Sequence, residues 1–162
     1  TTGHEIDALL EPLKAEDNDY QIILHQAICD RLVEAFAEYL HHQVRTQYWG
    51  YAPDENLSHK ELLKSRFDGI RPAYGYPACP EHTEKETLFK LLKVEQQAGI
   101  TLTEHHAMLP AASISGIYFA HPKARYFGLG KVAQDQLQDY AKRKRVQAQR
   151  VEKSLSMQYV LD

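Results

Sequence analysis

Residues 71–82, with the sequence RPAYGYPACPEH, combine one arginine with three of the chain's seven prolines and two tyrosines. Proline fixes its own φ and moves the preceding residue toward extended backbone, so this segment cannot be a helix. Such a backbone leaves N–H and C=O groups available to a planar heterocycle such as adenine, and Gly75 permits close approach. Arg71 adds a guanidinium that can bind a carboxylate through two hydrogen bonds. These features favour a small-molecule site.

Two other features can complete such a site. Glu34 places a carboxylate, suited to an ammonium group, on a helix with a broad apolar surface. Tyr126 and Phe127 begin a predicted strand, where neighbouring side chains point to opposite faces. A ligand with a carboxylate, an ammonium group and adenine fits this set, and S-adenosylmethionine is one. The structural alternatives stay open: Arg71 could form a buried salt bridge with Glu34, and the two aromatic rings could belong to the core.

Other kinds of chemistry find little support. The chain has nine histidines, with HH pairs at 41–42 and 105–106, and Cys79 and His82 form a C-x-x-H pair. A structural zinc site needs four clustered ligands, and no second pair completes one. The HExxH and GxSxG motifs are absent, and GLG at 128–130 lacks the spacing of a dinucleotide loop. We therefore predict no metal site and no catalytic acid, base or nucleophile.

Composition sets further limits. The 162 residues fit one domain, 1–162, with enough chain to bury a sizeable core. A net charge of -3 gives no footprint for nucleic acid, and the basic run KRKRVQAQR at 142–150 is better explained as a solvated helix face. No apolar run reaches the length of a membrane span. Two cysteines give no disulfide framework, so we expect a cytoplasmic protein. The first residues, TTGHEID, lack an initiator methionine, which suggests a piece of a longer protein.

The remaining sequence alternates between helical and strand patterns. We predict a long helix over 16–45, capped by one of the residues 17–19, whose broad apolar surface implies burial against more than one layer. Capping-box patterns, Ser58 with Glu61 and Thr83 with Glu86, introduce the next two helices. The predicted helices after the first are 59–66, 84–97, 133–145 and 147–155, and the predicted strands are 100–104, 112–121 and 124–132. This order predicts an α+β fold with an antiparallel sheet.

A family resemblance rests on several of these segments. RPAYGYPACPEHTEK at 71–85 resembles the S-adenosylmethionine-binding motif in the activation domain of cobalamin-dependent methionine synthase. Other segments are similar to the same family, in the same order along the chain: DRLVEAFAEYLH (30–41), YWGYAPDENL (48–57), TLTE (101–104), SISGIYFAHP (113–122) and QDQLQDYAKRK (134–144). The resemblance covers nearly the whole chain.

The resemblance implies a function. That enzyme, a methyltransferase, moves a methyl group from methyltetrahydrofolate to homocysteine through cobalamin, which is occasionally oxidised to inactive Co(II). The activation domain presents S-adenosylmethionine for reductive methylation of the metal, with flavodoxin or an equivalent reductase as the electron donor. Cobalamin is bound by a neighbouring domain, and zinc lies only in a distant domain of the full enzyme. The family's fold is a C-shaped α+β structure with a twisted antiparallel sheet and flanking helices.

The resemblance also implies site residues. The family's binding arginine corresponds to Arg71, its helix carboxylate to Glu34, and its tyrosine pair to Tyr126 and Phe127, so the second position lacks a hydroxyl here. Its backbone contacts correspond to Ala73, Gly75 and Tyr76, and a position facing the cobalamin domain corresponds to Asp30.

The family's domain is about twice this size, and its N-terminal half contributes an aspartate to the ligand. We therefore expect an incomplete site, a fragment without catalytic competence of its own, and self-association through the long helix. The alternative function is a stand-alone module that binds S-adenosylmethionine or a partner without methionine synthase activity.

Overall fold

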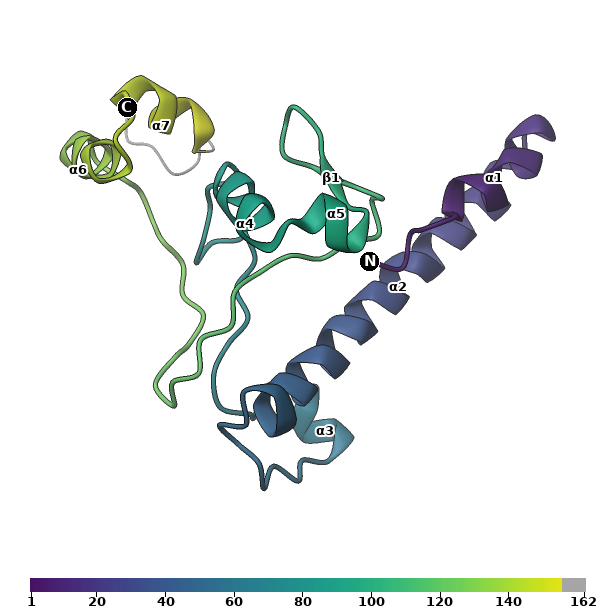
Figure 1. The fold of residues 1–162 in the computed structure, drawn as a ribbon, viewed down its shortest axis with the longest axis horizontal. Coiled ribbons are helices and arrows are strands. Elements are labelled where there is room, and N and C mark those ends of the chain that lie inside the picture. Colours follow the sequence, from purple (N-terminus) through teal and green to yellow (C-terminus); the bar gives the residue numbers. More distant parts are fainter. Residues whose placement is uncertain (156–162) are drawn as a thin grey trace.

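The structure is a computed structural model that describes residues 1–155 (Figure 1). Helices come first, a short antiparallel pair of strands follows, and helices end the described chain, which confirms the α+β class. The elements are α1 (Ile6–Ala15), α2 (Asp19–Gln43), the π-helix η1 (Val44–Tyr48), α3 (His59–Leu62), α4 (Glu84–Leu92), α5 (Val94–Ala98), β1 (Thr101–Leu102), β2 (Met108–Leu109), α6 (Gln134–Lys144) and α7 (Ala148–Ser154).

The shape is open. The arm formed by α1 and α2 lies on one side and the hairpin formed by α6 and α7 on the other, with α4, α5 and long extended segments between them (Figure 1). The accessible surface is 11645 Å², whereas a compact protein of this mass exposes about 8,200 Å². The expected sizeable core is therefore not formed, and the buried apolar cluster comprises Val132, Leu137, Ala141, Val151 and Leu155 around the α6–α7 hairpin.

The starts of α2 and α3 follow the predicted local chemistry. The Asn18 side chain accepts a hydrogen bond from the Gln21 N–H at 3.3 Å and caps α2. At α3, the predicted capping box is present, and Glu61 accepts from the Ser58 N–H at 2.9 Å. Helix α1 was not predicted at all. The predicted helix 84–97 is divided at Lys93, whose φ of 49° is left-handed, into α4 and α5.

The second predicted capping box is wrong. The Thr83 hydroxyl donates to the carboxylate of Glu81 instead of capping α4. Glu86 contacts the His106 Nε2 at 2.8 Å instead of the helix start. Both side chains fit the local pattern, but tertiary partners outside the helix engage them. Sequence spacing cannot reveal such competition.

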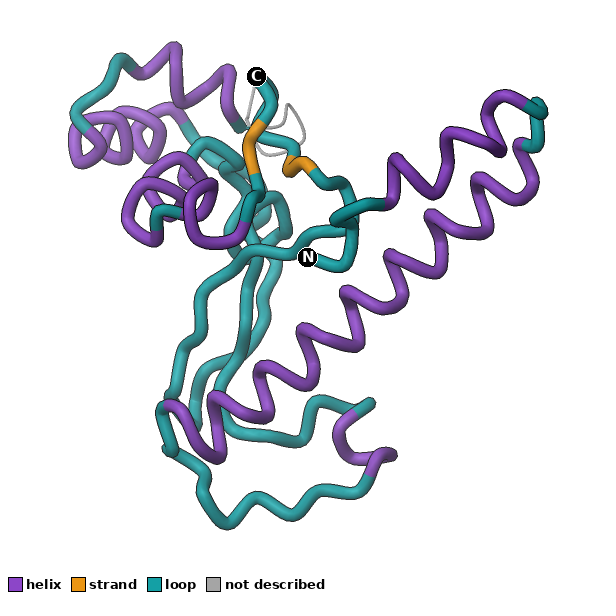
Figure 2. The backbone as a smooth tube through the Cα atoms, turned by 45° about the vertical axis from the view of Figure 1, so that its right-hand side comes forward, coloured by secondary structure: helices purple, strands orange, loops and turns teal. Residues whose placement is uncertain are grey.

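The segments predicted as strands have extended backbone in the structure, but most of them do not pair into a regular sheet. The regular sheet is β1 paired antiparallel with β2, while 112–121 and 124–132 run as extended segments beside the chain that follows Gly69 (Figure 2). Two hydrogen bonds link Ile70 with Phe119, at 3.1 and 2.9 Å. A turn joins the segments 112–121 and 124–132, since the Ala124 N–H donates to the His121 C=O at 2.9 Å. The predicted long ladder is wrong for the described residues, because β-branched patterns indicate extended backbone and not its partner.

Helix α2 is far more exposed than predicted. Of its apolar side chains only Val33 is buried. The exposed large ones include Ile23, Leu24, Ile28, Leu32, Phe36 and Tyr39. Helical periodicity indicates a surface that can be buried but says nothing about what covers it. Self-association through this face stays a prediction, which sedimentation velocity over a concentration series would measure. Within residues 1–155, no helix has both the length and the apolar character needed to cross a membrane.

Candidate functional site

Arg71 lies against the C-terminal part of α2. Its Nη2 donates to the carboxylate of Glu38, and its Nη1 lies 3.3 Å from the His41 Nδ1. Glu38 and His41 are three residues apart and share one helix face. Glu34 lies one turn earlier and is exposed. The structural alternative of an Arg71–Glu34 salt bridge is therefore wrong, and the carboxylate that pairs with Arg71 is Glu38.

His41 is a buried support for Arg71. Its side chain is fully buried, and its ring stacks on Tyr118 and meets Phe67 edge-on, both at a centroid distance of 5.0 Å. Burial, followed by the positive charges of Arg45 and Arg71, lowers the pKa of His41 to about 4. The imidazole is therefore neutral at pH 7. Because a guanidinium can only donate, the Nδ1 facing Arg71 must be the unprotonated nitrogen.

A second arginine, Arg45 in η1, packs against the same aromatic group as His41. Arg45 is fully buried, and its Nε and Nη2 donate to the two carboxylate oxygens of Glu55, both at 2.6 Å. Its guanidinium carbon lies 4.0 Å from the centroid of the Phe67 ring, on whose edge His41 also packs. A π-helical turn is a rare geometry that occurs often at functional sites. Here the π-helical turn carries Arg45, which packs on the same Phe67 ring as His41.

Residues 73–79 form a tight turn. The Gly75 N–H donates to the Cys79 C=O and the Cys79 N–H to the Tyr76 C=O, both at 2.8 Å. The Tyr76 N–H donates to the Ala73 C=O at 3.3 Å. The prediction of a fully open backbone is therefore wrong for these groups. No hydrogen bond links the Ala73 N–H or the Gly75 C=O to another residue within 1–155.

Gly75 is required for a different reason from the one predicted. Its φ is +98°, and a Cβ built on it would lie 2.1 Å from the Cε1 of His82. The His82 ring therefore occupies the space beside the glycine. Lys85 holds that ring in place, with its Nζ 3.0 Å from the His82 Nδ1.

Replacing Gly75 by alanine should lower the free energy of unfolding by about 1–3 kcal/mol, because the backbone is strained for an L-residue and the His82 ring must move. Urea denaturation measures the change. Gly128→Ala is the matched control, because nothing lies within 4 Å of the Cβ position at Gly128. Equal stabilities of the two variants would contradict the prediction.

Tyr126, the first residue of the aromatic pair, lies beside Arg71. The Tyr126 hydroxyl accepts a hydrogen bond from the Arg71 backbone N–H at 3.0 Å. The Tyr126 and Phe127 side chains are each about half exposed. The structural alternative that places both rings in a core is wrong for this chain. They remain on a face that a ligand can reach.

The structure brings some of the predicted residues together and separates others. Arg71 and Tyr126 are in contact, and the turn with Ala73, Gly75 and Tyr76 follows directly in sequence. Glu34 and Asp30 lie further along the exposed surface of α2. The sequence analysis missed Glu38, His41 and Tyr118. The spacing of Glu38, four residues after Glu34 on the same helix face, was the available signal.

Fold and site together define an α+β domain in which Arg71 meets the Tyr126 ring next to a proline-stiffened turn. The sequence matches the family model for the activation domain of vitamin B12-dependent methionine synthase over residues 1–145. The chain therefore belongs to this family.

A solved structure of the MetH reactivation domain bound to AdoHcy is 52% identical in sequence, with a TM-score of 0.93. The alignment covers 98% of this chain and 49% of that chain, so this chain spans about half the length of its solved relative.

Proposed function

We propose that this chain binds S-adenosylmethionine and presents it to a cobalamin held by another domain of a vitamin B12-dependent methionine synthase. One observation carries the proposal: a relative that is 52% identical and superimposes with a TM-score of 0.93 is described as bound to AdoHcy. AdoHcy is S-adenosylhomocysteine, the compound that S-adenosylmethionine becomes when it loses its methyl group. Family membership over residues 1–145 supports the same conclusion.

The arrangement around Arg71 fits such a ligand. The guanidinium has five N–H donors, and its contacts to Glu38 and His41 leave donors for a ligand carboxylate. The Ala73 N–H and the Gly75 C=O provide a donor and an acceptor for an adenine edge, which itself presents an acceptor and an amino group. The ring of Tyr126 lies next to Arg71 and can contact the ligand. Tyr76 and Phe127 offer further exposed surface beside the same segment.

We assign the remaining roles by resemblance to the family. Glu34 would bind the ligand's ammonium group, and Asp30, one turn earlier on the exposed side of α2, would face the cobalamin-binding domain. When bound, S-adenosylmethionine supplies a methyl group, and the residues of this chain bind and orient it without transferring a proton. The electron donor would be flavodoxin or an equivalent reductase, and the enzyme would act in the cytoplasm. A longer chain that includes the rest of the domain should bind the ligand more tightly.

Calorimetric titration with S-adenosylmethionine tests the proposal. Arg71→Ala should weaken binding by about 10- to 100-fold, because a charge-assisted hydrogen-bonded pair with the ligand carboxylate is lost. Arg143→Ala is the matched control, because the Arg143 side chain is 68% exposed and pairs with Asp139 on α6.

A second ligand identifies the group that Arg71 binds. Methylthioadenosine keeps the adenosine part but has no amino-acid carboxylate, so Arg71→Ala should leave its affinity nearly unchanged. The proposed function is wrong if neither compound binds to the unmodified chain and neither binds to a chain extended to the length of the solved relative. Equal weakening for both ligands would contradict the role given to Arg71.

A further inference from the structure

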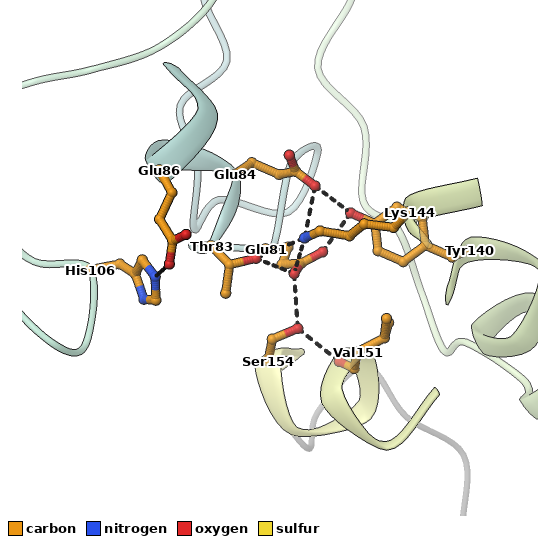
Figure 3. Close-up of polar contacts among 9 residues, drawn as sticks. All are labelled: Glu81, Thr83, Glu84, Glu86, His106, Tyr140, Lys144, Val151 and Ser154. Atoms are coloured by element: carbon orange, nitrogen blue, oxygen red, sulfur yellow. Dashed lines mark hydrogen bonds and ion pairs between the residues drawn. The ribbon is translucent and has the colours of Figure 1, made fainter. Parts of the chain in front are cut away.

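Glu81, the second-last residue of the proline-rich segment 71–82, carries a buried carboxylate. The residue is 5% exposed, and its carboxylate accepts hydrogen bonds from four side chains (Figure 3). The Tyr140 hydroxyl and the Lys144 Nζ, both from α6, lie at 2.5 Å, and the Ser154 hydroxyl from α7 lies at 3.0 Å. The Thr83 hydroxyl, at the start of α4, is the fourth donor. One side chain therefore joins three helices.

Glu84 adds a second carboxylate to this group. It lies 2.9 Å from both the Tyr140 hydroxyl and the Lys144 Nζ. We call the set Glu81, Thr83, Glu84, Tyr140, Lys144 and Ser154 the Glu81 cluster. Burial alone would raise the pKa of Glu81, but hydrogen bonds from Lys144, Thr83 and Tyr140 bring it below its usual value. The carboxylate is therefore charged at neutral pH and depends on its partners for compensation.

The α6–α7 hairpin packs mainly on itself. Its apolar residues Leu137, Ala141 and Val151 form their own small cluster with neighbouring side chains. Within residues 1–155, apart from the bonds between α6 and the adjoining Ala133, each hydrogen bond that joins the hairpin to the rest of the chain ends on Glu81, Thr83 or Glu84. The Glu81 cluster is thus the polar attachment of the hairpin.

The attachment point is close to the candidate site. Glu81 is two residues from Cys79, whose C=O accepts the Gly75 N–H at 2.8 Å. Pro80 lies between them, and its fixed φ limits how far the turn can move when Glu81 is held. His82, the next residue, packs its ring beside Gly75. Holding Glu81 therefore restrains the turn in two ways, through the Pro80 backbone that leads to Cys79 and through the His82 ring that packs beside Gly75.

We propose that Glu81 is a positioning residue for the ligand-binding turn and that the α6–α7 hairpin sets ligand affinity through Lys144, without contributing any of the proposed ligand contacts. The inference rests on the proposed function for its effect on S-adenosylmethionine. A pre-ordered turn raises affinity, because a mobile turn would lose conformational entropy when the ligand binds. Loosening the hairpin should therefore weaken binding from a distance.

The first measurement needs no ligand. Amide hydrogen exchange, followed by NMR, reports the Gly75 and Cys79 N–H groups, which both donate within the turn. In Lys144→Gln these two amides should exchange at least tenfold faster, while amides in the middle of α2 keep their rates. Lys142→Gln makes the same substitution two positions earlier, at an exposed residue, and should change neither set. Lys144→Arg should restore slow exchange, because it keeps a cation within reach of Glu81.

The second measurement is the affinity for S-adenosylmethionine, which should weaken about tenfold in Lys144→Gln and stay unchanged in Lys142→Gln. If Lys144→Gln does not fold, Tyr140→Phe replaces it as the test variant, because it removes the hydroxyl that contacts Glu81 and Glu84 but leaves every charge in place. Unchanged exchange at Gly75 and Cys79 in a folded variant would overturn the positioning role, whatever the ligand does. Faster exchange would support the positioning role even if S-adenosylmethionine bound neither to this chain nor to a chain extended to the length of the solved relative, a result that would refute the proposed function instead.

Discussion

Replacing Glu55 by glutamine should lower the free energy of unfolding by about 3–5 kcal/mol, because it leaves a buried guanidinium without its counter-charge. Arg45 is fully buried, and Glu55, with 6% of its side chain exposed, binds it through two hydrogen bonds of 2.6 Å. The Arg45 Nη1 already lacks a hydrogen-bond partner in the described part of the chain. No further compensation is therefore at hand when the carboxylate is removed.

Urea denaturation at pH 7 measures the loss, with Asp54→Asn as the control, because Asp54 is the exposed neighbour of Glu55. The double variant Arg45→Met with Glu55→Leu should recover most of the stability, since it removes both charges. A loss in Glu55→Gln no larger than that in Asp54→Asn would contradict the assignment.

The same pair predicts a response to acid. Burial would raise the pKa of Glu55, but the hydrogen bonds from Arg45 and His42 bring it below its ordinary value. The folded chain therefore holds this proton more weakly than the unfolded chain. The stabilisation is complete above the unfolded pKa of about 4.3 and disappears as the pH falls through the folded pKa.

His41 should make the protein less stable as the pH falls from 6.5 to about 4. Burial and the nearby charges of Arg45 and Arg71 lower its pKa, so in this interval the unfolded chain binds a proton that the folded chain does not. The free energy of unfolding should fall by up to about 3 kcal/mol across the interval from this residue alone. Above pH 6.5 His41 is neutral in both the folded and the unfolded chain, so this loss of stability is absent there.

His41→Phe isolates this effect. Phenylalanine keeps a ring between Tyr118 and Phe67 but cannot be protonated, so stability should depend less on pH between 6.5 and 4. His121→Phe, at an exposed position, is the control and should follow the unmodified chain. Parallel curves for His41→Phe and the unmodified chain would contradict the prediction. His41→Phe should also weaken S-adenosylmethionine binding, because Arg71 loses the acceptor at Nδ1.

The sequence predicted local structure well where local chemistry decides it. Asn18 and Ser58 cap their helices as expected, and the bounds of α2 and α6 lie within a few residues of the prediction. The prolines of 71–82 exclude a helix, and the motif in that segment identified the family. These successes share a cause, because capping, φ restriction and helical periodicity act over a few neighbouring residues.

The candidate site was predicted only in part. Arg71 could be selected by residue type and motif, but its partner could not. Glu34 and Glu38 lie one turn apart on the same helix, and only the tertiary structure shows that Arg71 meets α2 at Glu38 and His41. His41 resembled a helix-end histidine in sequence, yet Tyr118, 77 positions later, buries its ring. Residue types alone cannot distinguish such a support from a surface side chain.

By itself, the sequence determined the family, most of the helices and the segment that carries the candidate site. The tertiary structure alone decided that Arg71 pairs with Glu38 and His41, that Gly75 must leave room for the His82 ring, and that Glu81 holds the α6–α7 hairpin. The physical reason is the range of the interactions. Caps and periodicity join residues that are neighbours along the chain, whereas buried charges are stabilised by partners that only folding brings within hydrogen-bond distance.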